Sequence, residues 1–323
     1  MGILSIYFLN MPIAKKYILS VSFLFILFAA FGQQDPQFNQ ILFNPMSINP
    51  GYAGSLNMIG FGAINKLQFS GFGDGAPQST AVSINAPISP FGFKSGVGLS
   101  ILSDKYGFDD DLGISISYAA RFKFKAVDGT LGVGVNGGVI NNSIDPAWIF
   151  PDGTTDVAVP PKKENSVNFD LGLGLYYNTD YMFFGLSVTH LNETKMNKND
   201  QAARYTRQYY VTGGYTLNVN PAWQFEPSVV ITTDFVSSRY SFNSIVKYNK
   251  KFWGGFSYRI GEAITGMVGF ELFNGIKIGY AYEYCTTGNV SKYNDGSHEF
   301  MVGYNFQLKK EKPPQQYKSI RFL

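Results

Sequence analysis

Apolar and polar residues alternate strictly along the segment from Ser166 to Leu191. One parity is apolar and the other is small or polar, and the pattern resumes after a turn at 178–180. The apolar positions are Val167, Phe169, Leu171, Leu173, Leu175 and Tyr177, then Met182, Phe184, Leu186 and Val188. Side chains on a β-strand alternate between its two faces, so this segment predicts a hairpin with one continuous apolar face.

The same alternation recurs almost to the end of the chain. It predicts about fourteen strands, and an even number is typical of bacterial single-chain barrels. The predicted strands span residues 57–69, 78–87, 95–105, 111–124, 130–144, 166–177, 181–191, 207–219, 223–234, 239–249, 252–261, 263–273, 276–286 and 297–308.

The connections between these strands sort by length. Long connections follow odd-numbered strands, at 145–165, 192–206 and 287–296; tight ones follow even-numbered strands, at 126–129, 178–180, 220–222, 250–251 and 274–275. Outer-membrane barrels combine short periplasmic turns with longer outer loops, whereas a soluble sandwich has no reason to sort its loops in this way. We therefore predict an all-β fold: an antiparallel transmembrane β-barrel whose apolar rows face lipid.

The composition supports this prediction. The chain has 323 residues, of which 45% are hydrophobic, 16% aromatic and only 15% charged, and its mean hydropathy is −0.04. Globular domains carry about 25% charged residues. Alternating strands give near-neutral hydropathy together with many aromatics. A net charge of +3 gives no reason to expect a nucleic-acid partner, and the single Cys285 excludes an intrachain disulfide.

Residues 1–32 have the features of a signal peptide. Lys15 and Lys16 precede the apolar run 17–31, and small residues stand at Ala30 and Gly32. A retained anchor helix is the alternative, and Met11 is an alternative start to Met1. We expect export across the inner membrane and a place in the bacterial outer membrane.

Residues 33–56 lack both the helical and the strand periodicity. Three Asp/Asn-Pro steps, at Asp35, Asn44 and Asn49, impose turns. Irregular backbone is not tolerated in contact with lipid, so we expect this segment in the lumen or at its mouth, as a plug or a periplasmic cap. The barrel would span 57–308. Residues 309–323 would form a periplasmic tail, which either contacts other proteins or has no fixed structure.

The inward-facing positions carry charges of both signs. We predict a charge network in the lumen formed by Arg121, Lys123, Asp170, Glu226, Asp234, Lys247, Arg259, Glu271, Lys277, Glu283 and Glu299. Charges that leave water need partners of opposite sign. Pairing across the lumen favours a filled barrel, and the alternative is a porin whose charges are solvated.

Residues for catalysis or for cofactor binding are weakly represented. His190 lies on the outward parity of its strand and His298 at the start of the last strand, and neither has a convincing serine partner for nucleophilic chemistry. Asp104 and the run 109–111 could hold calcium, although a solvated acidic loop is the alternative. We expect no enzyme activity, no cofactor and no resident metal.

One short stretch resembles a known family. The residues that carry the likeness are Asp35, Pro36, Phe38, Gln40, Phe43, Asn44, Pro45, Asn49, Pro50, Tyr52, Ala53 and Gly54. Their spacing is similar to the opening signature of the PorP/SprF outer-membrane proteins of type IX secretion systems. Gly51 departs from it, because alanine is usual there. Later segments fit as well, so the resemblance spans the mature chain.

The resemblance implies a non-enzymatic role. Members of this family resemble barrels of about fourteen strands, related in shape to fatty-acid transporters. One branch acts with large surface adhesins, including those of gliding motility, whose C-terminal domains need the cognate barrel for export or anchoring. The other acts with the core secretion machinery and its periplasmic ring proteins. We favour the adhesin branch; a diffusion channel or hydrophobic-solute transporter is the competing function.

The partner would dock on the outer loops. The aromatic residues that these loops are expected to expose are Trp148, Phe150, Tyr205 and Tyr293. Aromatic side chains on a rigid scaffold are typical of binding hot spots.

Overall fold

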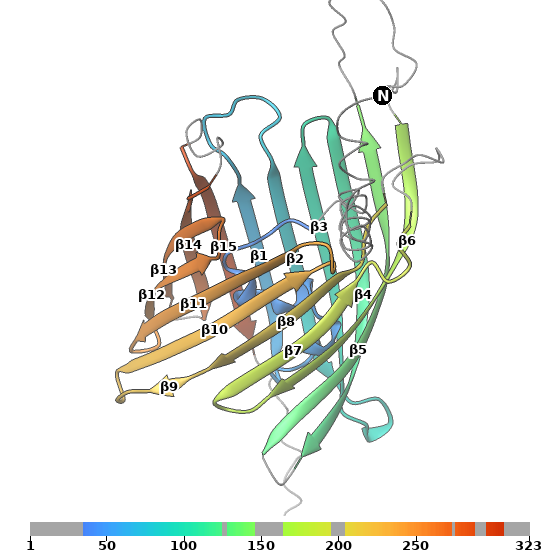
Figure 1. The fold of residues 1–323 in the computed structure, drawn as a ribbon. Helices are drawn as coiled ribbons and strands as arrows, with labels where there is room; N and C mark the ends of the chain where they lie inside the picture. The colour runs from blue at the N-terminus through green and yellow to red at the C-terminus, as the bar shows by residue number, and fades with distance from the viewer. Residues whose placement is uncertain are drawn as a thin grey trace, which may run out of the picture.

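The computed structural model describes residues 35–124, 128–145, 164–194, 204–272, 275–287 and 295–306. Its framework is one antiparallel sheet closed on itself, because β1 pairs with β15 and every other strand pairs with its neighbours along the chain (Figure 1). Among the described residues, no helix has the length and apolar character needed to cross a membrane.

The strands occupy nearly the predicted positions. They are β1 (Ile59–Leu67), β2 (Gln78–Ile88), β3 (Ser95–Tyr106), β4 (Asp109–Phe124), β5 (Gly129–Ile144), β6 (Glu164–Asn178), β7 (Met182–Thr189), β8 (Gln208–Tyr215), β9 (Leu217–Asn218), β10 (Trp223–Thr233), β11 (Ser238–Tyr248), β12 (Phe252–Arg259), β13 (Ala263–Glu271), β14 (Ile276–Cys285) and β15 (Ser297–Phe306). β8 and β9 both pair with β10 and together form one wall strand. The wall therefore has 14 strands, and the predicted barrel is confirmed.

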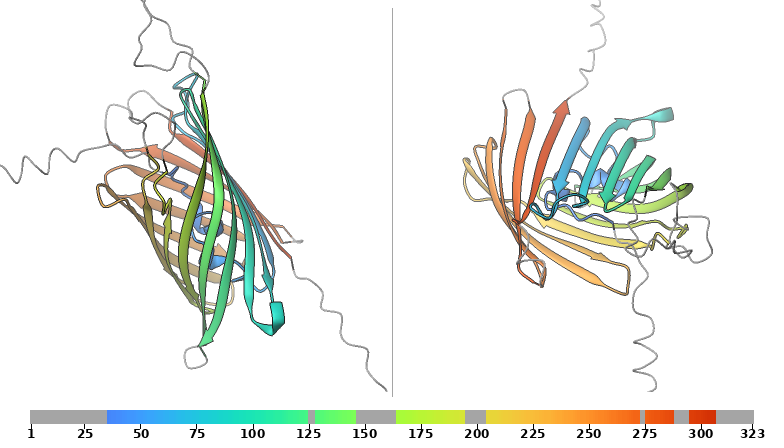
Figure 2. Two further views of the ribbon diagram at one scale, coloured as in Figure 1. Left: turned by 90° about the vertical axis from the view of Figure 1, so that its right-hand side faces the viewer. Right: turned by 90° about the horizontal axis from the view of Figure 1, so that it is seen from above.

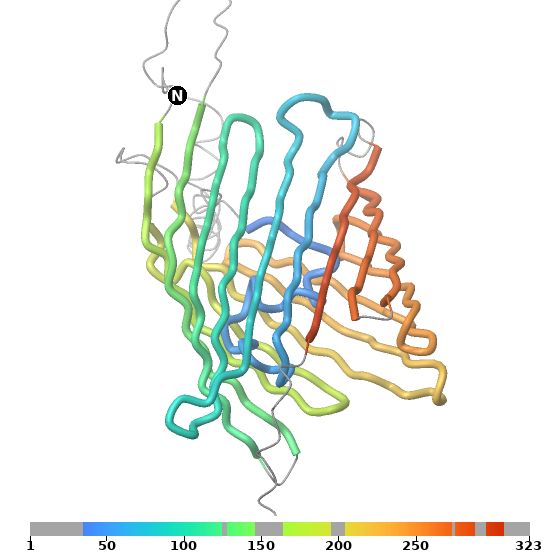
Figure 3. Tube along the Cα trace, turned by 180° about the vertical axis from the view of Figure 1, so that it is seen from behind, coloured from blue at the N-terminus to red at the C-terminus, as the bar shows by residue number. Residues whose placement is uncertain are grey.

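The wall is higher on one side than on the other. β4 and β5 have 16 residues each and β6 has 15, whereas β7, β8 and β12 have only 8. A strand of about 9–11 residues suffices to cross the hydrocarbon core. β3 to β6 rise above the shorter strands in Figure 1, and the same difference is visible from behind in Figure 3. We call the end with the connections 68–77, 145–163, 190–207 and 286–296 the loop end, and the opposite end the turn end.

The two faces of the wall differ in exposure as the alternation predicts. On β6, Leu173 and Leu175 point outward and are 44% and 42% exposed, whereas Tyr176 points into the lumen and is buried. An apolar row that points away from the only interior of the protein needs an apolar solvent. In an outer-membrane barrel that solvent is lipid.

The lumen holds the irregular segment that precedes β1. Residues 35–56 lie inside the ring of strands, as the view from above shows (Figure 2, right); we call them the plug. The plug contains three short 3-10 turns, η1 (Ile41–Phe43), η2 (Pro45–Ser47) and η3 (Pro50–Tyr52). Proline begins two of these turns, because its fixed φ suits a helical first position.

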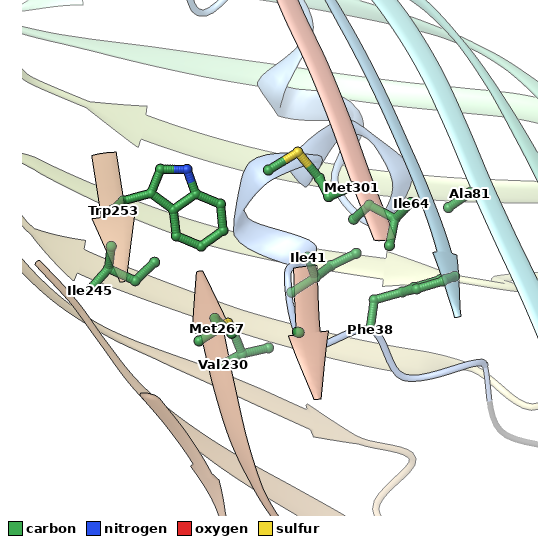
Figure 4. Packing of buried hydrophobic residues seen from close by; sticks show 10 residues of the cluster. Phe38, Ile41, Ile64, Ala81, Val230, Ile245, Trp253, Met267 and Met301 are labelled. Carbon is green, nitrogen blue, oxygen red and sulfur yellow. The ribbon is translucent and has the colours of Figure 1, made fainter. Parts of the chain in front are cut away.

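The apolar core of the protein lies between the plug and the inner face of the wall. Phe38 and Ile41 of the plug pack with Ile64, Met267 and Met301 of the wall (Figure 4). Phe43 stacks on Trp253 with ring centroids 4.6 Å apart. The outward face of the wall contacts lipid. The apolar side chains of the inner face therefore depend on the plug for their packing partners.

The plug approaches the wall closely at a pair of glycines. Gly54 has a φ of +69° and lies against Gly96 at the start of β3. A Cβ on Gly96 would overlap the carbonyl group of Ala53, which is backbone and cannot rotate away.

We predict that Gly96→Ala displaces the plug and lowers the free energy of unfolding by about 1–3 kcal/mol, the usual cost of overpacking. The unfolding transition of the purified barrel, followed by its heat-dependent shift on a denaturing gel, measures this change. Gly303→Ala is the matched control, because its Cβ would meet no atom closer than 3.7 Å. Equal transitions for both variants would contradict the close contact.

Candidate functional site

A buried carboxylate holds the first turn of the plug. Glu299 of β15 accepts hydrogen bonds from the backbone N–H groups of Asn39 and Gln40, each at 2.7 Å. Its side chain lies in the lumen and the residue is 1% exposed. The irregular backbone therefore finds in the wall the partners that it lacks within itself, as burial of peptide groups requires.

An ion-pair chain lies next to this contact. Lys66 Nζ is 3.0 Å from Glu283 Oε2, and Arg259 Nη1 is 3.3 Å from the same oxygen. Both cations also bind the plug: Lys66 donates to the carbonyl of Gln37 at 2.8 Å, and Arg259 donates to the side-chain oxygen of Asn39 at 3.0 Å. The chain thus joins β1, β12 and β14 to one another and to the plug.

A second buried cluster surrounds the first residue of the plug. His190 Nε2 is 2.7 Å from Asp35 Oδ1, and His190 Nδ1 is 2.9 Å from Asp170 Oδ1. The Tyr210 hydroxyl donates to Asp35 at 2.7 Å, and the Thr189 hydroxyl donates to it at 3.1 Å. The imidazole therefore bridges the plug and β6.

The protonation of this cluster follows from its geometry. Burial disfavours the imidazolium, but the carboxylates of Asp35 and Asp170 outweigh it and raise the pKa of His190 to about 10. Burial alone would raise the pKa of Asp35, yet the His190 charge and the hydrogen bonds hold it below its ordinary value. An imidazolium between two carboxylates is the resulting state at neutral pH.

The expectation that His190 points outward is wrong, because His190 is 8% exposed and bonded within the lumen. β7 ends at Thr189, and His190 has a φ of +53°. This left-handed residue breaks the alternation of the strand, so parity no longer indicates the direction of its side chain.

The second half of the plug binds the opposite wall. Asn49 donates to the carbonyls of Leu175 and Leu186, and its own side-chain oxygen caps the N–H of Gly51. Arg121 of β4 donates to the carbonyl oxygens of Gly51 and Ala53 at 3.3 and 3.2 Å. The Ser83 hydroxyl bonds the side chain of Asn44. Burial raises the pKa of Tyr52 to about 12, so its hydroxyl stays protonated.

The sequence model of one family, described as "Type IX secretion system membrane protein PorP/SprF", matches residues 30–304. The chain belongs to the PorP/SprF family. No curated protein matches the sequence.

Solved outer-membrane barrels share the fold of this PorP/SprF protein. The toluene transporter TbuX of Ralstonia pickettii is 13% identical with a TM-score of 0.50, over 80% of this chain and 92% of that one. Omp33 of Acinetobacter baumannii is 7% identical with a TM-score of 0.46, over 77% of this chain and 98% of that one. At these identities the likeness is one of fold alone. The family and the barrel fold place the protein in the outer membrane, and both are those of a secretion or transport membrane protein rather than of a known enzyme class.

Several of the PorP/SprF signature residues help to hold the plug. Asp35 binds His190, Gln40 binds Glu299, and Asn44 and Asn49 bind the wall. Gly51, which stands where alanine is usual, packs tightly: a Cβ there would lie 2.9 Å from the carbonyl oxygen of Gly174. The signature of this chain thus encodes a plug and its contacts.

The charges expected in the lumen form several separate groups. Arg259, Glu283 and Glu299 bind the plug together with Lys66, as Asp170 does through His190. At the turn end, Lys247 pairs with Glu226 at 2.7 Å and Lys277 lies 3.8 Å from Glu271. Arg121 binds plug carbonyls, and Lys123 pairs with Asp128 at the rim, where both are exposed.

Two residues do not lie where the sequence placed them. Asp234 lies in the turn between β10 and β11 and accepts the N–H groups of Val236 and Ser237, so it belongs to the turn and not to the lumen. Tyr205 was expected as an exposed anchor, but it is only 6% exposed and its ring lies 5.3 Å from that of His190. Its backbone N–H donates to the carbonyl of Thr194 at 3.1 Å. Trp148, Phe150 and Tyr293 lie outside the described residues.

Sequence reasoning missed Lys66, the most deeply buried cation of the site. The alternation on β1 places the Lys66 side chain in the lumen, so the sequence does indicate this residue. The predicted charge network, however, included charged residues of the later strands only. Among the described residues, the acidic side chains around Asp104 do not belong to any group of three or more metal-binding side chains. Asp104 instead accepts a hydrogen bond from Ser79 at 2.6 Å.

We predict that Glu299→Gln loosens the plug. The amide leaves a buried backbone N–H without an acceptor, which costs about 1–3 kcal/mol. Thermal unfolding of the purified barrel measures the loss. Glu271→Gln is the control: its ion pair is half-exposed, so its effect should stay within about 1 kcal/mol. An equal loss in both variants would contradict the role given to Glu299.

We predict that alkaline pH weakens the His190 cluster. Its pKa is raised from an ordinary 6.5 to about 10 in the folded protein, so the stabilisation is complete below the ordinary value and is lost as the pH rises toward about 10. The melting temperature of the wild type should therefore fall over this interval. His190→Gln should be less stable at neutral pH and should lack this decline. A parallel decline in both proteins would show that other groups titrate.

Proposed function

We propose that this PorP/SprF barrel is a docking protein of the type IX secretion system. It would bind the C-terminal domain of a large secreted adhesin at the loop end and support its export or its anchoring at the cell surface. The observation that carries the proposal is the plug: residues 35–56 occupy the lumen and are held by the Asp35–His190 ion pair and by hydrogen bonds to buried charged side chains of the wall on both sides. A barrel filled in this way is suited to binding rather than to passing a large solute.

The shape of the wall supports a binding role. β4, β5 and β6 exceed the length that crosses the hydrocarbon core, so part of this sheet stands beyond it at the loop end. Sheet strands hold side chains more firmly than loops do, and rigid presentation lowers the entropy cost of association.

The charge of the loop-end rim indicates which charge the docking face of the partner carries. The described rim of the loop end, outside the lumen, has more acidic than basic residues: Asp74, Asp109, Asp110, Asp145, Glu164, Glu193, Asp234 and Asp295 against Lys105, Arg204 and Arg207. Opposite charge accelerates encounter and sets orientation. We infer that the docking face of the adhesin domain is basic.

A second candidate is the branch of the family that belongs to the core machinery. The turn between β2 and β3 projects Phe91, which is fully exposed and has a φ of +51°. Phe93 beside it is 45% exposed, and Lys94 is also exposed. An exposed aromatic in a strained turn at the turn end favours contact with a periplasmic ring protein.

We predict that the tagged full-length barrel binds the purified C-terminal domain of its cognate adhesin. Asp74→Asn with Asp110→Asn should weaken binding several-fold, and high salt should do the same because it screens rim charges. Asp128→Asn with Asp180→Asn, at the turn end, is the matched control and should bind as the wild type does.

Failure of the wild type to bind this domain would overturn the proposal. If Phe91→Ser at the same time abolished recovery of a periplasmic ring protein, the machinery branch would replace it.

A further inference from the structure

Wall strand β10 contains a proline where a barrel strand needs a backbone donor. The ladder with β11 runs past this position without interruption, with Pro227 opposite Ser244. On the other side, Ser228 pairs with Gly214 and Phe225 pairs with Leu217, but no pair forms between them in this described stretch. The register is the same before and after the break, so no residue is inserted. The ladder is interrupted because proline has no N–H to donate.

A cavity of about 200 Å³ lies behind this break, in the turn-end half of the lumen. Tyr215, Thr216 and Pro227 of the interrupted ladder are among the residues that line it. The wall of a closed barrel normally leaves no backbone path between lipid and lumen. Here the weakest point of the ladder and a cavity coincide.

The lining of the cavity is apolar on one side. Leu42 and Phe43 of the plug contribute to it, together with Ile245 and Met301 of the wall. Ile245 and Met301 are otherwise fully covered, at 6% and 2% exposure. Such a surface suits an aliphatic chain.

The opposite side of the cavity carries an excess of positive charge. Lys247 and Lys277 line it with a single carboxylate, Glu226, which pairs with Lys247 at 2.7 Å. The nearest carboxylate to Lys277 is Glu271 at 3.8 Å, and Glu271 does not line the cavity. The Lys277 ammonium is therefore the group that can bind an anionic head.

We propose that this cavity is a binding site for a single-chain carboxylate amphiphile, which enters from the membrane through the break at Pro227. The chain lies against Leu42, Ile245 and Met301, and the carboxylate is held by Lys277. The cavity is too small for a two-chain phospholipid. The site is distinct from the proposed docking surface, which lies at the other end of the barrel, so either can fail without the other.

The test uses the full-length barrel in phosphatidylcholine nanodiscs and radiolabelled octanoic acid, whose chain is short enough for a cavity of about 200 Å³. The wild type should bind the acid more tightly than its methyl ester. Lys277→Gln should weaken binding of the acid about tenfold and leave the ester unaffected, because it removes one charge-assisted contact. Lys250→Gln, an exposed lysine of the same end, is the control and should leave binding unchanged.

Two further variants separate occupancy from entry. Leu42→Trp fills the cavity from the plug without altering a wall strand and should abolish binding. Pro227→Val restores the missing donor and should slow uptake from the bilayer several-fold at unchanged final occupancy. The heat-dependent gel shift reports that each variant is folded.

Equal affinity for the acid and the ester in the wild type would overturn the assigned head group. Unchanged binding in folded Leu42→Trp would overturn the site, and unchanged uptake in Pro227→Val would overturn the route through the wall.

Discussion

The structure depends on one constraint: an irregular backbone at membrane depth must find every hydrogen-bond partner in protein. The plug satisfies this constraint because its backbone groups form hydrogen bonds with side chains of the wall. Glu299 accepts two of its N–H groups, and Lys66 and Arg121 donate to its carbonyls. Because these partners are charged, their bonds are stronger than neutral ones. These charged partners also restrict where the plug can lie, because a charged group that moved away from its partner at this depth would remain buried and unpaired.

This constraint explains why the lumen is charged although it is filled. In a water-filled pore, inward charges need no particular partner, but here Lys66, Arg259, Glu283 and Glu299 lie within one bonded group. Such a group adds less to stability than its contacts suggest, because each charge first loses its hydration. Its larger effect is on specificity: a plug shifted by one residue would set Asn39 and Gln40 away from Glu299. The network therefore selects one position of the plug.

The sequence predicted the wall well, because alternation with period two is a direct consequence of strand geometry and the lipid face leaves it undisturbed. It predicted the site less well, because parity holds only while the strand continues. His190 follows the end of β7 and has a left-handed backbone conformation. No residue pattern in the sequence indicated that the alternation ends there. Tyr205 shows a second limit: an aromatic residue in a long connection suggests exposure, yet the Tyr205 ring is buried next to that of His190. Which acid meets which base depends on the register across the lumen, and local sequence does not encode that register.

The contacts within the lumen consequently differ between the two ends of the barrel. The Asp35–His190 ion pair and the hydrogen bonds that Gln37 and Gln40 form with Lys66 and Glu299 belong to the loop-end half of the lumen, beneath the acidic rim. Toward the turn end the contacts are looser: Lys277 and Glu271 are 3.8 Å apart, and the ladder beside Pro227 is interrupted. Rigidity is useful where a folded partner must be met without an entropy cost. Looser packing is useful where a small flexible molecule has to enter. The two proposed sites would therefore lie at opposite ends of one plug.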